Sequence, residues 1–324
     1  MIKQPSNAAL QTRLLRELEP VVEVELNRHI STAKDWYPHE YVPWSEGRNF
    51  AGPLNGDAWE AKDSKLTTVA QDSLVLNLLT EDNLPSYHTE ITLSMSQDGA
   101  WNQWVNRWTA EEARHSIVMR DYLMATRGVD PNELEDLRMS HMQAGYQTPY
   151  DNDMLHTVSY VTFQELATRI SHRNTGKISN DPICEGMLAR VALDENLHML
   201  FYRNTIAAAL ELEPDATMVA IKDVVTNFAM PGAGMPGWGR KSVQIALAGI
   251  YDLKSHLDEV VHPVLRAWKI FEMSNLSSVG EAARLELSAF LEKATQDAQT
   301  FIEKRDAHFA RLAARGQEAI RLNP

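Results

Sequence analysis

Two short segments decide the fold of this 324-residue chain: EEARH, residues 111–115, and DENLH, residues 194–198. Each contains a glutamate followed three residues later by a histidine. On a helix this offset places both side chains on one face, about a turn apart, so that one metal ion can contact a carboxylate oxygen and an imidazole nitrogen. The two segments therefore predict metal-binding helices.

A further glutamate precedes each segment at nearly the same distance. Glu81 stands before Glu112, and Glu165 stands before Glu195, each in its own helical segment. The chain thus contains an internal repeat: a helix with a glutamate, a loop, and a helix with Glu-x-x-His. Folded on itself, this repeat predicts a four-helix bundle with four glutamates and two histidines pointing inward, which is the ligand set of ferritin-like di-iron bundles.

The Glu-x-x-His spacing is not specific by itself, because Glu259 and His262 have it too. That copy has no upstream glutamate, and a proline follows its histidine. A lone copy on an acidic helix is usually a solvated face. The two paired copies instead lie on apolar stripes, where an unpaired charge is costly. Four carboxylates and two neutral imidazoles carry a charge of about −4, which two divalent iron ions would balance.

Composition excludes several other classes of protein. The chain is 44% hydrophobic and 23% charged, and its net charge of −13 disfavours nucleic acid as a partner. The single cysteine, Cys184, excludes an intramolecular disulfide or a thiolate-ligated site. The sequence lacks a run of apolar residues long enough to span a membrane and has no signal-peptide pattern, so we expect a soluble, cytoplasmic protein.

The pattern of the chain predicts an all-α fold with a single domain over residues 1–324. We expect an N-terminal segment over residues 1–63, made of an amphipathic helix with Pro20 at a start or kink and then an ordered loop. The core bundle should span about residues 64–212, with Ser64 as an N-cap and a distortion caused by Pro85 next to Glu81. Additional C-terminal helices over residues 213–324 should pack on it. Helices are expected at 101–127, 154–176, 183–212, 215–229, 239–271 with a break near Ser255, and 279–315.

Longer stretches of the sequence resemble a known family. They are TEDNLPSYHTEI (80–91), WVNRWTAEEARHSIVMRDYL (104–123), FQELATRISHRNTGK (163–177) and DENLHMLFYR (194–203), joined by LEPVVEVELNRH (18–29), WYPHEYVPW (36–44) and HLDEVVHPVLRAW (256–268). Together they closely resemble the soluble acyl-acyl carrier protein desaturases, the stearoyl desaturase family, and most of all its actinomycete branch. The resemblance covers most of the chain.

This resemblance implies a homodimeric helical enzyme that inserts a cis double bond into a fatty acyl chain carried on acyl carrier protein. It would use O₂ and two electrons from a ferredoxin. The resemblance also implies two iron ions as cofactor, with Glu112 and Glu165 as bridges. The two ligand sets it implies are Glu81, Glu112 and His115 for one iron, and Glu165, Glu195 and His198 for the other.

Three further residues match positions with a role in that family. Thr168 matches a threonine near the oxygen-binding side of the metal centre. Trp36 and Asp194 match a tryptophan and an aspartate on a hydrogen-bonded route from the surface to His115, which implies an electron path. Independently of the resemblance, an acid placed like Asp194 could orient a ligand histidine through its second ring nitrogen.

A long acyl chain needs a narrow apolar tunnel beside the metal ions. Candidates for its walls are Leu84, Trp108, Met119 and Phe163, all of which simple core packing explains equally well. Acyl carrier protein is acidic, so an acidic enzyme needs a local basic patch to bind it. Arg28, Lys34, Arg173 and Lys177 are candidates for that patch, although scattered solvated charges would look the same.

Alternative functions share parts of this pattern. Iron storage would need the same ligands but not so long a chain. A di-iron oxygenase that hydroxylates or N-oxygenates another substrate would also fit the ligand set, and a metal-free helical scaffold that binds a carrier protein would fit the fold. The membrane desaturases are excluded, because the chain has neither their histidine boxes nor spanning segments.

Overall fold

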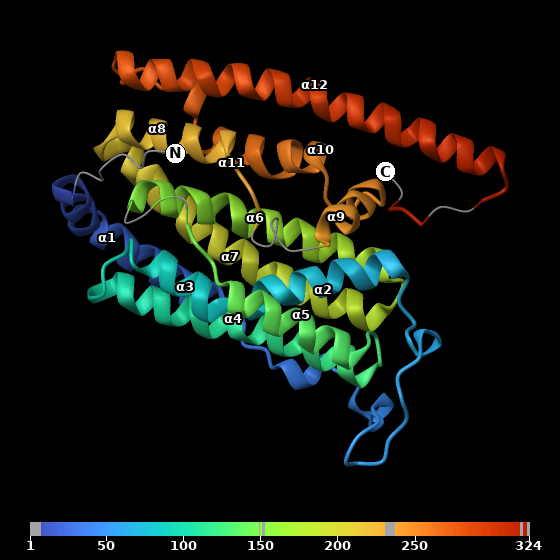
Figure 1. Cartoon of the computed structure of the whole chain (residues 1–324). Coiled ribbons are helices and arrows are strands. Elements are labelled where there is room, and N and C mark those ends of the chain that lie inside the picture. Colours follow the sequence, from blue (N-terminus) through green and yellow to red (C-terminus); the bar gives the residue numbers. More distant parts are fainter. Residues whose placement is uncertain (1–7, 149, 151–152, 231–236, 318–319, 323–324) are drawn as a thin grey trace.

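The computed structural model describes residues 8–148, 150, 153–230, 237–317 and 320–322. Its described part is helical, with one isolated β-bridge between Phe50 and Asp57, so the predicted all-α class is confirmed. Four long helices form the core: α2 (Thr68–Asp82), α4 (Gly99–Ala125), α6 (Met154–Ser179) and α7 (Pro182–Leu212). Figure 1 shows them as a bundle at the centre of the molecule.

Short polar signals set the ends of the core helices. The side chain of Asp153 accepts a hydrogen bond from the backbone N–H of His156 at the start of α6, and Asp181 does the same for α7, where a proline occupies the first position. The N-cap of α2 is Thr67. The prediction that Ser64 caps this helix is wrong, because its hydroxyl instead donates to the carbonyl of Gly128.

The predicted distortion at Pro85 is present. Helix α2 ends at Asp82, and after Asn83 the short helix α3 (Leu84–Thr92) begins, with the proline in its first turn. A proline has no N–H to donate, so the carbonyl of Glu81 loses the partner that would have continued the helix. The chain therefore changes direction directly after the first metal-facing glutamate.

Other helices surround this bundle. Helix α1 (Ala8–Thr32) packs on α4 and α7, and Pro20 lies within it without ending it. Residues 33–67 form a loop with three short 3-10 turns, η1 (Pro38–Glu40), η2 (Trp44–Glu46) and η3 (Ala61–Asp63). Helix α5 (Pro131–Ala144) was not predicted, because among its residues only Leu134 is buried and the segment has no apolar stripe.

The C-terminal helices form a layer over α6 and α7 (Figure 1). The predicted break near Ser255 is present: the chain leaves the helical form at residues 248–252, where Gly249 has positive φ, and the α-helix that resumes gives way to a π-helical turn after Ser255. The layer contains α8 (Pro214–Thr226), α9 (Trp238–Leu247), α10 (Leu253–Ser255), the π-turn η4 (His256–Val261), α11 (His262–Ala267), η5 (Ile270–Glu272) and α12 (Ser278–Ala314).

Two apolar clusters flank the middle of the bundle. Along α4, the buried residues Trp101, Trp104 and Trp108 belong to one cluster, and those from Val118 onward belong to the other. Helix α7 crosses the same two clusters in the opposite order. The Glu-x-x-His segments lie between the clusters on both helices, so the charged side chains are enclosed by apolar packing at either end.

Candidate metal centre

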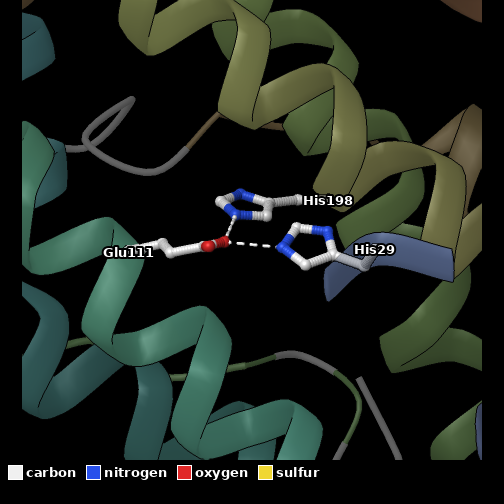
Figure 2. Close-up of side chains that lie close together, drawn as sticks. All are labelled: His29, Glu111 and His198. Carbon is white, nitrogen blue, oxygen red and sulfur yellow. Dashed lines mark hydrogen bonds and ion pairs between the residues drawn. The ribbon is translucent and has the colours of Figure 1, made fainter. Parts of the chain in front are cut away.

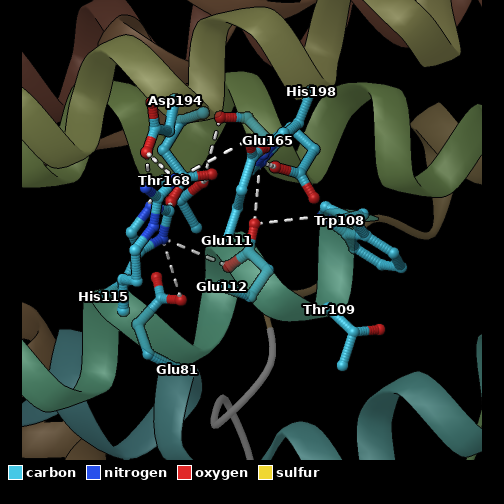
Figure 3. A network of polar contacts seen from close by, with 12 residues as sticks. Glu81, Trp108, Thr109, Glu111, Glu112, His115, Glu165, Thr168, Asp194 and His198 are labelled. Atoms are coloured by element: carbon cyan, nitrogen blue, oxygen red, sulfur yellow. Dashed lines mark hydrogen bonds and ion pairs between the residues drawn. The ribbon is translucent and has the colours of Figure 1, made fainter. Parts of the chain in front are cut away.

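The structure brings together all six side chains that the repeat singled out. They come from four helices: Glu81 from α2, Glu112 and His115 from α4, Glu165 from α6, and Glu195 and His198 from α7 (Figure 3). Every one of them is at most 5% exposed. Six ionisable groups at this depth are unusual, because the charged forms lose their hydration.

Their ligating atoms form two adjacent groups. One group consists of Glu81, Glu112, His115 and Glu195, and the other of Glu112, Glu165, Glu195 and His198; within each, one ligating atom per residue lies within 4.8 Å of the others. Glu112 and Glu195 belong to both groups. The predicted bridging place of Glu165 is therefore not the one that the geometry favours, since Glu195 of α7 takes the shared position beside Glu112.

The inward-facing atoms lie against one another: Nδ1 of His115 is 3.2 Å from Oε1 of Glu195, and Nδ1 of His198 is 3.3 Å from Oε2 of Glu165. The Nδ1 atoms of His115 and His198, Oε2 of Glu165 and Oε1 of Glu195 are buried and make no hydrogen bond within the described residues. Native structures seldom leave such atoms unpaired. Oxygen and nitrogen donors that face one another in two groups of four suit iron or manganese. The residues present therefore fit a pair of such cations.

Electrostatics lead to the same conclusion. Burial, and then the charges of Glu112 and Glu195, raise the pKa of Glu81 and the pKa of Glu165. Burial would also disfavour a charged His115, but Glu112 and Asp194 raise its pKa well above the usual value. Without cations, the glutamates repel one another and the imidazoles take up protons to offset them. A divalent cation in each group would replace those protons.

An outer carboxylate holds each of the two histidines. Oδ2 of Asp194 lies 3.5 Å from Nε2 of His115 and accepts a hydrogen bond from Nε1 of Trp36 at 2.7 Å. Arg190 and Arg114 also contact this aspartate. An ionised carboxylate only accepts, so the imidazole donates through Nε2 and its Nδ1 faces the centre. The predicted proximity of Trp36, Asp194 and His115 is present.

The second outer carboxylate is Glu111, which sequence reasoning missed. Its Oε2 lies 2.9 Å from Nε2 of His198 and 2.8 Å from Nε2 of His29 (Figure 2). Arg107 donates to its other oxygen at 2.6 Å. Burial would raise the pKa of Glu111, but the hydrogen bonds from His198 and His29 lower it. Glu111 occupies the place in EEARH that Asp194 occupies in DENLH, and that correspondence could have revealed it.

The two outer carboxylates serve each other's segments. Asp194 precedes Glu195 on α7 but contacts His115 of α4, whereas Glu111 precedes Glu112 on α4 but contacts His198 of α7. Each segment thus completes the histidine of the other. The guanidinium of Arg114 lies between them, with Nη2 at 3.3 Å from Asp194 and 3.6 Å from Glu111.

Another missed residue is His172. Its Nε2 lies 3.0 Å from Oε1 of Glu81 and 3.5 Å from Oε1 of Glu195. Burial would lower its pKa, but hydrogen bonds with these two carboxylates raise the pKa of His172 to about 9. It lies two turns after Glu165 on α6, and two helical turns return a side chain to the same face. That spacing was a usable signal.

Thr168 and Trp108 contact the two shared carboxylates. The hydroxyl of Thr168 lies 3.0 Å from Oε2 of Glu195 and 2.9 Å from the backbone carbonyl of Glu165, so its single proton can serve one of them at a time. Nε1 of Trp108 donates to Oε1 of Glu112 at 3.0 Å. Both polar groups sit where they can stabilise a carboxylate that changes its position.

The four candidates for the walls of the acyl tunnel lie in different parts of the structure. Trp108 and Phe163 belong to one apolar cluster, and Met119 belongs to the other. Phe163 packs edge-on against Trp268 of the C-terminal layer, at 5.6 Å between ring centroids. Leu84 is half-buried at the start of α3. These contacts do not gather the four residues along one wall.

The candidates for a basic patch do not form a free positive surface either. Arg28 pairs with Glu25, and Arg173 pairs with Glu259. Lys34 and Lys177 are exposed. The binding of acyl carrier protein at these residues stays a prediction. None of the helices among the described residues combines the length and the apolarity that a bilayer crossing needs.

Comparison with known proteins identifies the family. The sequence profile of a fatty acid desaturase family matches residues 10–315. The chain is 52% identical over 284 residues to DesA1 of Mycobacterium tuberculosis, whose name assigns it to the acyl-[acyl-carrier-protein] desaturases, covering 85% of this chain and 83% of DesA1. It is 29% identical over 292 residues to the chloroplastic stearoyl-[acyl-carrier-protein] 9-desaturase of Gossypium hirsutum, covering 84% of this chain and 72% of the cotton protein.

A solved structure gives the same result. The X-ray structure of DesA2 from Mycobacterium tuberculosis H37Rv superimposes with a TM-score of 0.67 at 32% identity, covering 79% of this chain and 95% of DesA2. Its title names that protein, too, as an acyl-ACP desaturase. The helical fold, the buried carboxylate and histidine groups and these matches lead to one conclusion: the chain belongs to the fatty acid desaturase family, among its acyl-[acyl-carrier-protein] desaturases.

Proposed function

We propose that the chain inserts a cis double bond into a fatty acyl chain carried on acyl carrier protein, with two iron ions as its cofactor. The observation that supports this most directly is a set of buried ligating atoms on His115, His198, Glu165 and Glu195 that face one another and make no hydrogen bond within the described residues. In the proposed site, Glu81 and His115 serve one ion, Glu165 and His198 serve the other, and Glu112 and Glu195 are shared.

Iron and dioxygen would supply the oxidising power needed to remove hydrogen from an unactivated methylene, which no side chain provides. The residues of the chain have three tasks around that chemistry. Asp194 and Glu111 hold the imidazoles with Nδ1 inward, Trp108 and Thr168 steady the shared carboxylates, and the two apolar clusters keep water away.

We further propose that electrons from a ferredoxin reach the site through Trp36 and Asp194. The indole ring of Trp36 is parallel to the imidazole of His115 at 6.4 Å between centroids, and its N–H is bonded to the aspartate that contacts the same imidazole. The family resemblance supports a homodimer acting in the cytoplasm.

Product analysis tests the reaction. The full chain is loaded with iron and incubated with O₂, a reduced ferredoxin system and acyl carrier protein carrying saturated chains of several lengths, and the released fatty acids are examined by mass spectrometry. The expected product is a cis-monounsaturated chain. The Glu112→Ala variant should give none, whereas Glu133→Ala, which removes an exposed carboxylate on α5, should behave like the unaltered protein.

Two other results would contradict the proposal and identify an alternative. A hydroxylated chain without a double bond would indicate an oxygenase. Tight binding of the acyl carrier protein without any oxidised product, by a chain that holds no iron, would indicate a scaffold. The position of the double bond would also show which part of the acyl chain lies beside the iron ions.

A further inference from the structure

A cavity lies between α6 and α7 on one side and the π-turn η4 and α11 on the other. Its volume of about 380 Å³ is in the range of small-molecule sites. Leu166 and Asn196 line it, and each directly follows a metal-facing glutamate, so they lie on different faces of their helices from those glutamates. Arg169 and Met199 also line it, each four residues after one of these glutamates, so the cavity lies beside the metal centre along the same two helices.

Positive charge dominates the polar part of this cavity. Three arginines line it, Arg169 and Arg173 from α6 and Arg203 from α7, against one carboxylate, Glu259 of η4. Nη2 of Arg173 pairs with Oε2 of Glu259 at 2.6 Å, but its Nε is buried without an acceptor. Arg203 donates only to the neutral side-chain oxygen of Asn204, and among the described residues Arg169 makes no hydrogen bond or ion pair.

Neighbouring arginines act on both Arg169 and Arg203, and Glu259 and Glu25 offset this effect only in part. Burial, and then the charge of Arg173, lower the pKa of Arg169. Burial, and then the charge of Arg28 from α1, lower the pKa of Arg203. An anion in the cavity would offset this repulsion, could accept from the half-buried Arg169 and Arg203, and would give the buried Nε of Arg173 an acceptor.

The remaining lining is apolar and includes Leu166, Ile170 and Val264. We propose that the cavity binds an amphipathic carboxylate, with its head between Arg169 and Arg203 and a short alkyl part against these apolar side chains. The planar fork of a guanidinium matches a carboxylate, and a bare inorganic anion would leave the apolar wall unused. A medium-chain free fatty acid has this chemistry.

Such a site would distinguish a free acid from a carrier-bound chain. An acyl group attached to its carrier as a thioester has no carboxylate, so it cannot pair with the arginines. Glu259 of the π-turn would compete with the carboxylate of the ligand, because it already pairs with Arg173, one of the three arginines. π-Helical turns are rare and frequently occur at functional sites. A ligand in this cavity would contact α6 and α7, which carry three of the six metal-facing side chains.

Calorimetric titration of the full chain with octanoate, acetate and inorganic phosphate tests the proposal. Octanoate should bind more tightly than either of the other two. Arg169→Gln and Arg203→Gln should each weaken octanoate binding about tenfold, the value of one charge-assisted contact. The matched control Arg311→Gln, on the exposed last turn of α12, should change it less than twofold.

The Glu259→Gln variant controls for the possibility that an arginine variant loses binding because it misfolds. Removing this carboxylate frees Arg173 and deletes a negative charge from the cavity, so octanoate should bind several-fold more tightly, and a gain in affinity cannot arise from lost structure. Absence of octanoate binding would overturn the proposal. If octanoate bound to the Arg169→Gln and Arg203→Gln variants as tightly as to the unaltered protein, the ligand would lie elsewhere and the proposal would be wrong. Tighter binding of phosphate than of octanoate would also overturn it. The proposed desaturation stands or falls separately, by its products.

Discussion

Asp194 and Glu111 hold corresponding positions in the two Glu-x-x-His segments, but they have different surroundings. Asp194 contacts an indole, that of Trp36, and shares its oxygens with two arginines. Glu111 forms hydrogen bonds with Arg107 and with the fully buried His29. The Nδ1 atom of His29 has no hydrogen-bond partner in the described structure. Asp194 thus connects His115 to the indole of Trp36, the side chain for which we propose a role in electron transfer. Glu111 connects His198 to His29 and Arg107, for which we propose a positioning role.

The comparison teaches that similar positions in a repeat can carry different tasks. Both carboxylates fix an imidazole, which the metal centre needs twice. Only on the Asp194 side does an indole N–H donate to the outer carboxylate in the described structure; on the Glu111 side, the indole of Trp104 packs edge-on against the rings of His29 and His198. The four predictions below test this division, starting from the side chains that both halves share.

Glu112→Ala should abolish iron binding in both groups at once, because Glu112 belongs to both. The helical content should persist, since the substitution relieves repulsion among buried carboxylates. Iron content by elemental analysis and helicity by circular dichroism measure the two effects. Full iron loading of this variant would defeat the ligand assignment.

Glu111→Gln and Asp194→Asn form a matched pair that keeps the shape of each side chain. Loss of an outer carboxylate typically costs about 10–100-fold in metal affinity. We expect the larger loss for Glu111→Gln, because this carboxylate lies 2.9 Å from its histidine whereas Asp194 lies 3.5 Å from its own. Iron titration against a chelator measures both. Equal losses would show that the two carboxylates hold their histidines alike.

The pH dependence of stability separates His172 from a histidine outside the centre. The pKa of His172 and that of His156 are both raised to about 9, the first by Glu195 and Glu81 and the second by Asp153 and Asp223, in each case against burial. A histidine whose pKa is raised on folding stabilises the folded state fully at pH values below its unfolded-state pKa, near 6.5. This stabilisation is lost as the pH rises through the folded-state pKa, about 9.

In chemical unfolding of metal-stripped protein, we therefore expect the free energy of unfolding to fall between pH 6.5 and 9, by at most about 3 kcal/mol for each histidine. His172→Gln and His156→Gln should each flatten part of that fall. Iron should remove the His172 part, because the cations replace the protons, and should leave the His156 part. A His172 contribution that persists in iron-loaded protein would contradict its link to the centre.

Substitutions of Trp36 and His29, the residues that contact Asp194 and Glu111 on the side away from the metal centre, should have the smallest effects. Trp36→Phe removes the N–H that Asp194 accepts and should slow reduction of the bound iron a few-fold while iron content stays unchanged. His29→Phe should leave the reduction rate unchanged and lower the stability by about 1–2 kcal/mol, because it removes a buried hydrogen bond of Glu111. Stopped-flow reduction and urea unfolding measure these. If the iron bound to the His29→Phe variant were also reduced more slowly, the proposed difference between the Asp194 side and the Glu111 side would be wrong.

Sequence reasoning predicted the core bundle and the six inward side chains because both depend on local spacing. The offset of three places Glu112 and His115 on one face of a helix, and the apolar stripes around them require that face to be buried. Helix α5 escaped prediction because it buries almost nothing.

The contacts that sequence reasoning missed cross between helices. No spacing shows that Glu111 of α4 meets His29 of α1, although this histidine continues the buried stripe of Leu18, Val22 and Leu26. The shared place of Glu195 depends on how α7 crosses α4 and α6, which local patterns do not contain. Trp36 and Asp194 could be placed together only through the family resemblance.

The exchange of outer carboxylates between the two segments has a consequence for biosynthesis. Each of the two ligand groups takes residues from both halves of the repeat, and each histidine is oriented by the opposite half. A nascent chain that ends before residue 195 therefore cannot complete either group, and one that ends before residue 198 cannot complete the second. If the groups hold the proposed cations, loading of both has to wait until α7 has left the ribosome and closed against α4, which would make metal loading a late checkpoint on correct folding.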